Sequence, residues 1–181
     1  CGKTTVFNGY TGARQHVGNY PGVTVDRKEG QFVFNGEPVT LVDLPGTYSL
    51  TAYSQEELVA RRELAANNVQ AVIDVVDSSA LERNLLLTVQ MLEMGMPVVL
   101  ACNMMDEARA AGIHIDMDRL SRMLDIPVVP MVARTGEGLK KAMELAVSLA
   151  RAGKRDPLRL SYGADLDTAL LELEKGIESS G

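Results

Sequence analysis

The sequence is poor in cysteine and aromatic residues and has no long apolar run. Its 181 residues include two cysteines, no tryptophan and only 4% aromatic residues. Two cysteines cannot make the disulfide framework of a small secreted domain. The longest apolar stretches, Met96–Cys102 and Ile126–Ala133, are far shorter than the roughly 18 residues that a membrane-spanning helix needs. No segment of this sequence is therefore predicted to cross a membrane.

Positive charge is also scarce. The chain has 18 Lys and Arg against 24 Asp and Glu, which gives a net charge of −6. An acidic balance disfavours nucleic acid as a partner and disfavours an anionic membrane surface. At 46% hydrophobic residues the chain can bury a core, so disorder is not expected.

Short apolar segments alternate with helical patterns. Continuous apolar runs predict strands buried on both faces of a mostly parallel sheet; these are Val39–Val42, Ala71–Val76, Pro97–Cys102 and Val128–Val132. Apolar residues at helical spacing predict helices between and after them, over Ser54–Ala66, Ala80–Met94 and Leu139–Ala150. Asn35 and Gly36 separate two more apolar runs and predict a hairpin with one antiparallel edge strand. The expected fold is a three-layer α/β domain.

The C-terminal part reads differently from the rest. Gly153–Gly163 has the turn residues of a linker, and Asp165–Glu178 reads as one further helix. We expect residues 1–155 to form one domain and residues 156–181 to be a linker and the start of a helical domain. Because the chain opens on Cys1 rather than on Met, we expect the first domain to lack its first strand and half of its phosphate loop.

Two segments have the character of a phosphate site. Gly2-Lys3-Thr4 is the end of the G-x-x-x-x-G-K-[ST] pattern, in which backbone amides and the lysine bind phosphates and the hydroxyl binds Mg²⁺. Alone, this tripeptide is better explained by an ordinary helix start. Asp43-Leu44-Pro45-Gly46 follows a strand, where a carboxylate suits Mg²⁺ and a glycine amide suits a γ-phosphate. Its alternative is a capped turn.

Two later segments have the character of a base site. Asn103-Met104-Met105-Asp106 follows the third strand, and a carboxylate at Asp106 can accept two hydrogen bonds from guanine but not from adenine. Asn103 would brace the neighbouring loops; the alternative is an ordinary helix cap. After the fourth strand, an exposed backbone N–H at Ala133, within Val132-Ala133-Arg134, could meet the guanine carbonyl oxygen. Because all four segments follow in order at loop positions, they predict one guanine-nucleotide site at the carboxyl ends of the strands.

The residues resemble those of small P-loop GTP-binding domains of the translation-factor-related branch. They look most like the N-terminal cytosolic G domain of the bacterial ferrous iron transport protein B (FeoB) family. The sharpest match is the Val17–Val25 segment followed by Arg27-Lys28-Glu29-Gly30, although the family usually has Trp where Tyr20 stands. The segment from Asp43 to Leu50 is similar too.

The resemblance implies a set of roles. Switch I would span Ala13–Asp26 and switch II Leu44–Gln55. Thr24 would ligate Mg²⁺ and touch the γ-phosphate, so that Lys3, Thr24 and Gly46 would act in catalysis and Thr4, Thr24 and Asp43 would hold Mg²⁺. The full set of expected nucleotide contacts is Cys1, Gly2, Lys3, Thr4, Thr5, Gly22, Val23, Thr24, Asp43, Leu44, Pro45, Gly46, Asn103, Met104, Asp106, Val132, Ala133 and Arg134.

The resemblance also shapes the expected activity. Thr47 stands where many small GTPases have a glutamine that orients water, so slow GTP hydrolysis is expected. K⁺ is a further ion that the resemblance implies, through an Asn that would precede Cys1. The implied function is the GTP-dependent switch of a bacterial ferrous iron transporter, placed on the cytoplasmic side of the inner membrane. Its partners would be a guanine nucleotide, the membrane part of the same parent chain and further copies of the full-length protein.

Two alternatives share these motifs. One is a GTPase of ribosome assembly or tRNA modification, which the acidic charge disfavours. The other is a nucleotide-sensing module in which hydrolysis is incidental, which Thr47 keeps open.

Overall fold

The structure is a computed structural model, and it describes all but a few short stretches of the chain. The described residues are 1–12, 15–51, 53–66, 68–153, 155–161, 163 and 166–171. Six strands form two sheets, an antiparallel one in the order β1-β2-β3 and a parallel one in the order β4-β5-β6. The strands are β1 Gln15–Asn19, β2 Asp26–Phe34, β3 Glu37–Asp43, β4 Val72–Asp77, β5 Val98–Asn103 and β6 Val128–Pro130.

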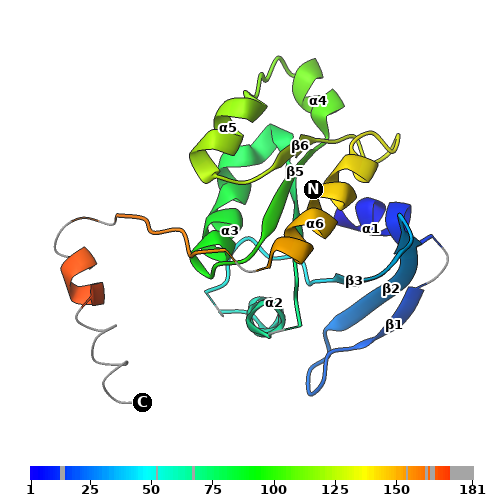
Figure 1. Cartoon of the computed structure of the whole chain (residues 1–181), viewed down its shortest axis with the longest axis horizontal. Coiled ribbons are helices and arrows are strands. Elements are labelled where there is room, and N and C mark those ends of the chain that lie inside the picture. Colours follow the sequence, from blue (N-terminus) through cyan, green and yellow to red (C-terminus); the bar gives the residue numbers. More distant parts are fainter. Residues whose placement is uncertain are drawn as a thin grey trace.

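Helices cover both faces of the parallel sheet (Figure 1). They are α1 Lys3–Thr11, α2 Gln55–Ala65, the short 3-10 helix η1 Ser78–Ala80, α3 Leu81–Glu93, α4 Met105–Ala110, α5 Met117–Leu124 and α6 Leu139–Ala152. Residues 166–171 are also helical. None of the helices in the described part of the chain is long and apolar enough to cross a membrane.

The central strand β5 divides the core into two halves. Leu100 and Cys102 face a cluster that includes residues of α2 and α3. Val99 and Ala101 face the other way, towards α1 and α6. Because both faces are covered, every residue of β5 is buried, which explains why its sequence is a continuous apolar run. The predicted three-layer α/β fold is confirmed.

The antiparallel part is larger than the single edge strand that the sequence predicts. The expected hairpin is present, with positive φ at Asn35 (50°) and Gly36 (86°), as a two-residue turn of this kind requires. However, β2 begins eight residues before Phe34, at Asp26, and β1 pairs with it from Gln15 to Asn19. The prediction missed β1 because its only strongly apolar residue, Val17, is 58% exposed, so burial leaves no pattern in its sequence.

Other boundaries differ by a few residues. The fourth predicted strand is shorter than expected, since Val132 leaves the sheet and forms an isolated bridge with Glu137. Helix α5 was not predicted, and it begins where the Asp116 side chain accepts a hydrogen bond from the Arg119 amide. The predicted helix over Asp165–Glu178 is described only for residues 166–171; its remaining positions, like Ala13 of the expected switch I, lie outside the described residues.

The segment after α6 is docked on the core. The Leu158 amide donates to the Leu92 carbonyl at 2.9 Å, and the Leu158 side chain packs against the cluster around α3. The Arg155 guanidinium donates to the Asp125 carbonyl (2.8 Å) and carboxylate (3.1 Å). Gly95 has φ +70°, and a Cβ there would lie 2.9 Å from the Arg155 carbonyl oxygen, so this crossing needs glycine.

Candidate functional site

The first turn of α1 offers free backbone donors. The helix begins at Lys3 and follows Gly2, whose φ of 77° is left-handed. The amides of the first helical turn have no acceptor within the helix, and the helix dipole adds positive potential there. Thr4 and Thr5 lie exposed in this turn. The arrangement suits an anion such as a phosphate.

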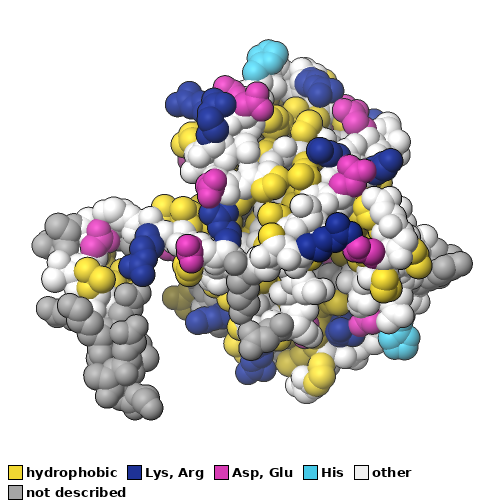
Figure 2. All heavy atoms as spheres, viewed as in Figure 1, with side chains coloured by type: hydrophobic (Ala, Val, Ile, Leu, Met, Phe, Trp, Pro, Cys, Tyr) yellow, Lys and Arg dark blue, Asp and Glu magenta, His cyan; other side chains and the backbone are white. Residues whose placement is uncertain are grey.

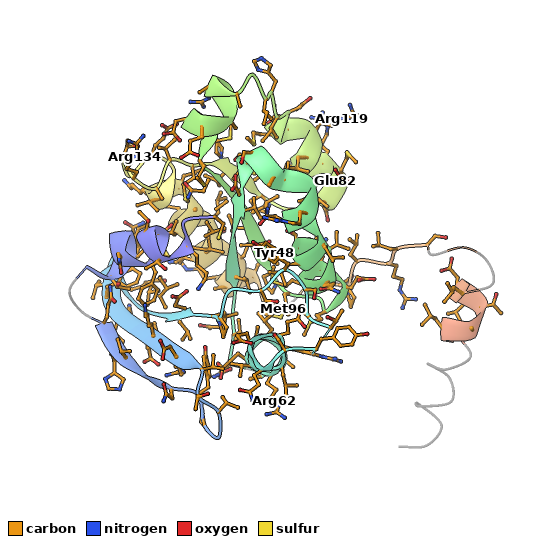
Figure 3. The ribbon with its side chains drawn as sticks, turned by 180° about the vertical axis from the view of Figure 1, so that it is seen from behind. Tyr48, Arg62, Glu82, Met96, Arg119 and Arg134 are labelled. Atoms are coloured by element: carbon orange, nitrogen blue, oxygen red, sulfur yellow. The ribbon has the colours of Figure 1, made fainter. Side chains whose placement is uncertain are left out.

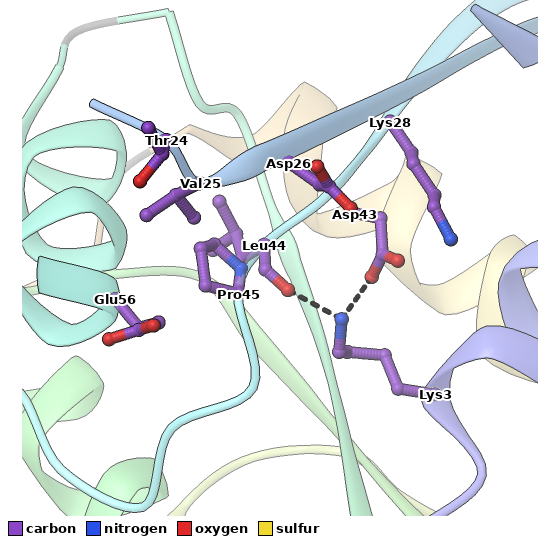
Figure 4. A pocket seen from close by; sticks show the side chains of 9 residues that line it. All are labelled: Lys3, Thr24, Val25, Asp26, Lys28, Asp43, Leu44, Pro45 and Glu56. Carbon is purple, nitrogen blue, oxygen red and sulfur yellow. Dashed lines mark hydrogen bonds and ion pairs between the residues drawn. The ribbon is translucent and has the colours of Figure 1, made fainter. Parts of the chain in front are cut away.

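Lys3 joins α1 to the end of β3. Its ammonium donates to a carboxylate oxygen of Asp43 and to the Leu44 carbonyl oxygen (Figure 4). The Asp43 side chain is 9% exposed and the Lys3 side chain 34%. Two residues that the motifs place 40 positions apart are therefore in direct contact, and the carboxylate has a counter-ion in this state of the protein.

A pocket of about 310 Å³ opens beside this ion pair. Five of the predicted residues line it, namely Lys3, Thr24, Asp43, Leu44 and Pro45, together with Val25, Asp26, Lys28 and Glu56. The predicted Thr4, Thr5, Gly22, Val23 and Gly46 are not among its lining residues. Asp26 and Lys28 are two residues apart in β2, so their side chains lie on the same face of the strand. The sequence shows this only once β2 is known to start at Asp26.

Asn103 ties the phosphate end to the base end. Its side chain is almost fully buried at the end of β5, where Nδ2 donates to the Cys1 carbonyl at 2.8 Å and Oδ1 accepts from the Ala133 amide at 2.9 Å. The predicted bracing contact is therefore present. A Cβ on Gly2 would lie 2.5 Å from Asn103 Nδ2, so this close approach also requires glycine.

The Ala133 amide is not free, contrary to expectation. Its N–H donates to Asn103, and the residue is only 8% exposed. The prediction of an exposed N–H for the guanine carbonyl oxygen was wrong at this residue, because the loop after β6 turns inward to satisfy Asn103. The Val132 carbonyl accepts from the Thr135 amide and hydroxyl, each at 3.0 Å, so the loop is internally hydrogen-bonded.

Asp106 lies in the first turn of α4 and points to the same loop. Met104 has φ 62° and turns the chain from β5 into the helix. Asp106 Oδ2 accepts from Arg134 at 2.7 Å, and this hydrogen bond lowers the pKa of the Asp106 carboxyl. Arg134 itself is mostly exposed (Figure 3). The carboxylate is therefore charged at neutral pH, as an acceptor for two N–H donors must be.

The expected switch II is held to α2 and α3. The Thr47 hydroxyl donates to the Ser49 carbonyl at 2.6 Å and accepts from the Ser49 amide, so it is turned into its own loop. The Arg83 guanidinium of α3 lies 4.5 Å from the centre of the Tyr48 ring, and the Leu50 amide donates to Gln90. Among the described residues of this segment, Leu44 and Pro45 line the pocket, and neither has a side chain that could orient a water as a glutamine does.

Comparison with known proteins decides the family. A sequence model of the family described as ferrous iron transport protein B matches residues 1–146. The chain belongs to the FeoB family. Its relatives include the Fe(2+) transporter FeoB of Salmonella typhimurium, 52% identical over 150 residues that make up 81% of this chain and 19% of that protein.

Longer matches cover nearly the whole chain. The Fe(2+) transport protein A/Fe(2+) transporter FeoB fusion protein of Porphyromonas gingivalis is 46% identical over 182 residues, covering 99% of this chain and 22% of that protein. The chain thus spans about a fifth of the length of these FeoB relatives.

Solved FeoB structures have the same fold. The cytosolic domain of T. maritima FeoB in its GMPPNP form superimposes with a TM-score of 0.93 at 40% identity, over 99% of this chain and 71% of that one. The cytosolic domain of L. pneumophila FeoB gives 0.91 at 39% identity, over 100% of this chain and 78% of that one.

Proposed function

We propose that this FeoB-family domain binds GTP and GDP and hydrolyses GTP slowly, as the regulatory switch of a bacterial membrane transporter of Fe²⁺. The observation that carries the proposal is the pair of hydrogen bonds that the Asn103 side chain makes with Cys1 and Ala133. These bonds hold a phosphate-binding helix start and a base-binding loop at a fixed distance from each other. The relatives named as Fe(2+) transporters, and the T. maritima structures in GDP and GMPPNP forms, support it.

At the base end, recognition would rest on Asp106. Its carboxylate would accept the guanine N1–H and exocyclic amine, and the hydrogen bond from Arg134 lowers the pKa of this carboxyl. Hydrogen bonds to a charged acceptor contribute about 1.5–3 kcal/mol, which is enough for strong discrimination. With the Ala133 amide engaged, Val132, Ala133 and Met104 would serve as the walls of the base site rather than as donors.

At the phosphate end, the first-turn amides of α1 and Lys3 would bind the phosphates. Lys3 would have to leave Asp43 to do so, and the Gly46 amide would meet the γ-phosphate. The oxygens available here fit Mg²⁺, because this ion takes oxygen ligands and is usually bound through one or two carboxylates, here that of Asp43, beside phosphates and water. Thr4, Thr24 and Asp43 would hold Mg²⁺, which would neutralise phosphate charge. K⁺ rests on family resemblance alone.

A nucleotide sensor with incidental hydrolysis is the second candidate. It is favoured by Thr47, whose hydroxyl is engaged with Ser49 and so does not orient a water. Single-turnover GTP hydrolysis with and without K⁺ separates the two candidates: measurable turnover supports the switch, and none in either salt supports the sensor.

The base site has its own test. Asp106→Asn should lose preference for GTP and gain affinity for XTP, because an amide presents a donor where the carboxylate presents an acceptor. Competition of both nucleotides against labelled GDP measures this exchange, and unchanged discrimination would refute the assignment of Asp106.

The domain organisation and location complete the proposal. Residues 1–155 would form the G domain and 156–181 the connection to a helical domain, on the cytoplasmic side of a bacterial inner membrane. Basic and acidic side chains are interspersed on the face seen in Figure 2, which supports a partner other than nucleic acid.

A further inference from the structure

The pocket beside the Lys3–Asp43 pair is lined by a second lysine, Lys28, to which the proposed nucleotide site gives no role. Lys28 on β2 lines this pocket with Lys3, Asp43 and Asp26 (Figure 4). Within the described part of the chain, no hydrogen bond or ion pair engages the Lys28 ammonium. This half-buried lysine without a partner lies beside the Asp43 carboxylate, which is 9% exposed. Its charge is therefore available to Asp43 when the present counter-ion of Asp43 leaves.

The strand register places Lys28 against Asp43. The two residues are direct partners in the antiparallel pairing of β2 and β3. Side chains of directly opposite residues lie on the same face, with Cβ atoms about 5 Å apart. A lysine stem is long enough to bring its ammonium to the opposite carboxylate from that position. Asp26, two residues along β2, lies on the same face and keeps the Lys28 side chain in an acidic neighbourhood.

Phosphate binding removes the present partner of Asp43. The Lys3 ammonium now serves the Asp43 carboxylate and the Leu44 carbonyl. The same ammonium would turn to the phosphates when a nucleotide binds to the first turn of α1. A largely buried carboxylate left without a counter-ion is costly, so this exchange needs a replacement charge.

We propose that Lys28 is a positioning residue that replaces Lys3 as the counter-ion of Asp43 when Lys3 turns to the phosphates. The inference rests on the proposed nucleotide binding and extends it to a residue outside the set of expected nucleotide contacts. Lys28 lowers the cost of releasing Lys3, and therefore tightens binding of both the diphosphate and the triphosphate. Its effect is greatest without Mg²⁺, since the ion would give Asp43 another source of positive charge.

The test compares GDP affinity of wild type and Lys28→Gln in EDTA and in saturating Mg²⁺, by titration with a fluorescent GDP. The glutamine keeps most of the stem and removes the charge. We expect about a five-fold loss of affinity in EDTA and less than about two-fold in Mg²⁺. Lys28→Arg, which keeps the charge, should bind like wild type. Lys141→Gln, at an exposed position on α6, should change neither value.

The ratio of the two losses is measured on one protein preparation, so a partly unfolded variant does not distort it. Equal losses with and without Mg²⁺, or no loss in either, would overturn the inference. A loss confined to the GTP analogue GMPPNP would also overturn it, because it would mean that Lys28 touches the terminal phosphate. If wild type itself does not bind GDP, the proposed function fails; if only the ratio is flat, the inference alone fails.

Discussion

A buried carboxylate in the core offers a sharp test of how this fold is stabilised. Asp74 lies on β4 and is 7% exposed, and the Thr88 hydroxyl of α3 donates a hydrogen bond to its carboxylate at 2.6 Å. Burial raises the pKa of Asp74 from 3.8 to about 6, and the Thr88 hydrogen bond offsets only part of this shift. The charged form therefore costs stability at neutral pH.

The magnitude follows from the pKa difference. An acid whose pKa is raised on folding binds its proton more tightly in the folded state. Its contribution to stability is complete below the unfolded pKa and is lost as pH rises towards about 6. The difference between a pKa of 3.8 and a pKa of about 6 corresponds to about 3 kcal/mol. Most of this loss occurs between about pH 4.5, where it amounts to about 1 kcal/mol, and about pH 8.

Asp74→Asn removes the charge and keeps the shape. We expect the variant to gain about 2 kcal/mol more over wild type at about pH 8 than at about pH 4.5. Any cost of burying the amide N–H₂ is the same at both pH values and cancels in this difference. Urea unfolding at the two pH values, with matching slopes, gives the free energies. Asp118→Asn, the same chemical change at an exposed position on α5, is the control. An equal effect of Asp74→Asn at both pH values would refute the reasoning.

Three further predictions concern switch I, the phosphate loop and α2. Thr24→Ala should leave GDP affinity unchanged but reduce the extent to which bound GMPPNP protects switch I from a protease. If GMPPNP and GDP protect switch I of the wild type equally, that result would count against the role of Thr24. Gly2→Ala should cost about 1 kcal/mol of folding free energy in backbone strain and should also weaken GDP binding by displacing Asn103. The control is Gly112→Ala, which should cost strain alone, because Gly112 has a similar φ of 75° and no atom lies within 4 Å of the added Cβ. Similar GDP affinity in the two variants would contradict this prediction. Ser54→Ala removes the N-cap of α2, which accepts from the Glu57 amide, and should lower the unfolding free energy by about 1 kcal/mol in a urea titration.

The sequence predicts those parts of the fold that burial or turn chemistry marks locally. Strand β5 is covered on both faces, so its apolar run is unmistakable, and the Asn35-Gly36 turn marks its hairpin. Strand β1 is different, because it owes its conformation to pairing with β2 rather than to its own residues. A strand whose side chains are mostly exposed leaves no hydrophobic period to detect.

The candidate site also has a part that local sequence patterns predict and a part that they do not. The motifs predict Lys3, Asp43, Asn103 and Asp106 individually, because each follows a strand or starts a helix. The Ala133 amide donates its hydrogen bond to the Asn103 side chain, 30 positions away in the sequence. No local sequence pattern shows this tertiary contact. The place of Lys28 opposite Asp43 likewise depends on the register of β2 and β3, which the sequence alone leaves open.

The docked segment after α6 changes where the folded unit ends. Because the Leu158 amide binds the Leu92 carbonyl and its side chain packs on the core, a division after residue 155 passes through a packed contact rather than through a free linker. The core around the end of α3 is complete only with Leu158 in place. The segment after α6 is therefore joined to α3, the same helix that contacts Tyr48 and Leu50 of the expected switch II.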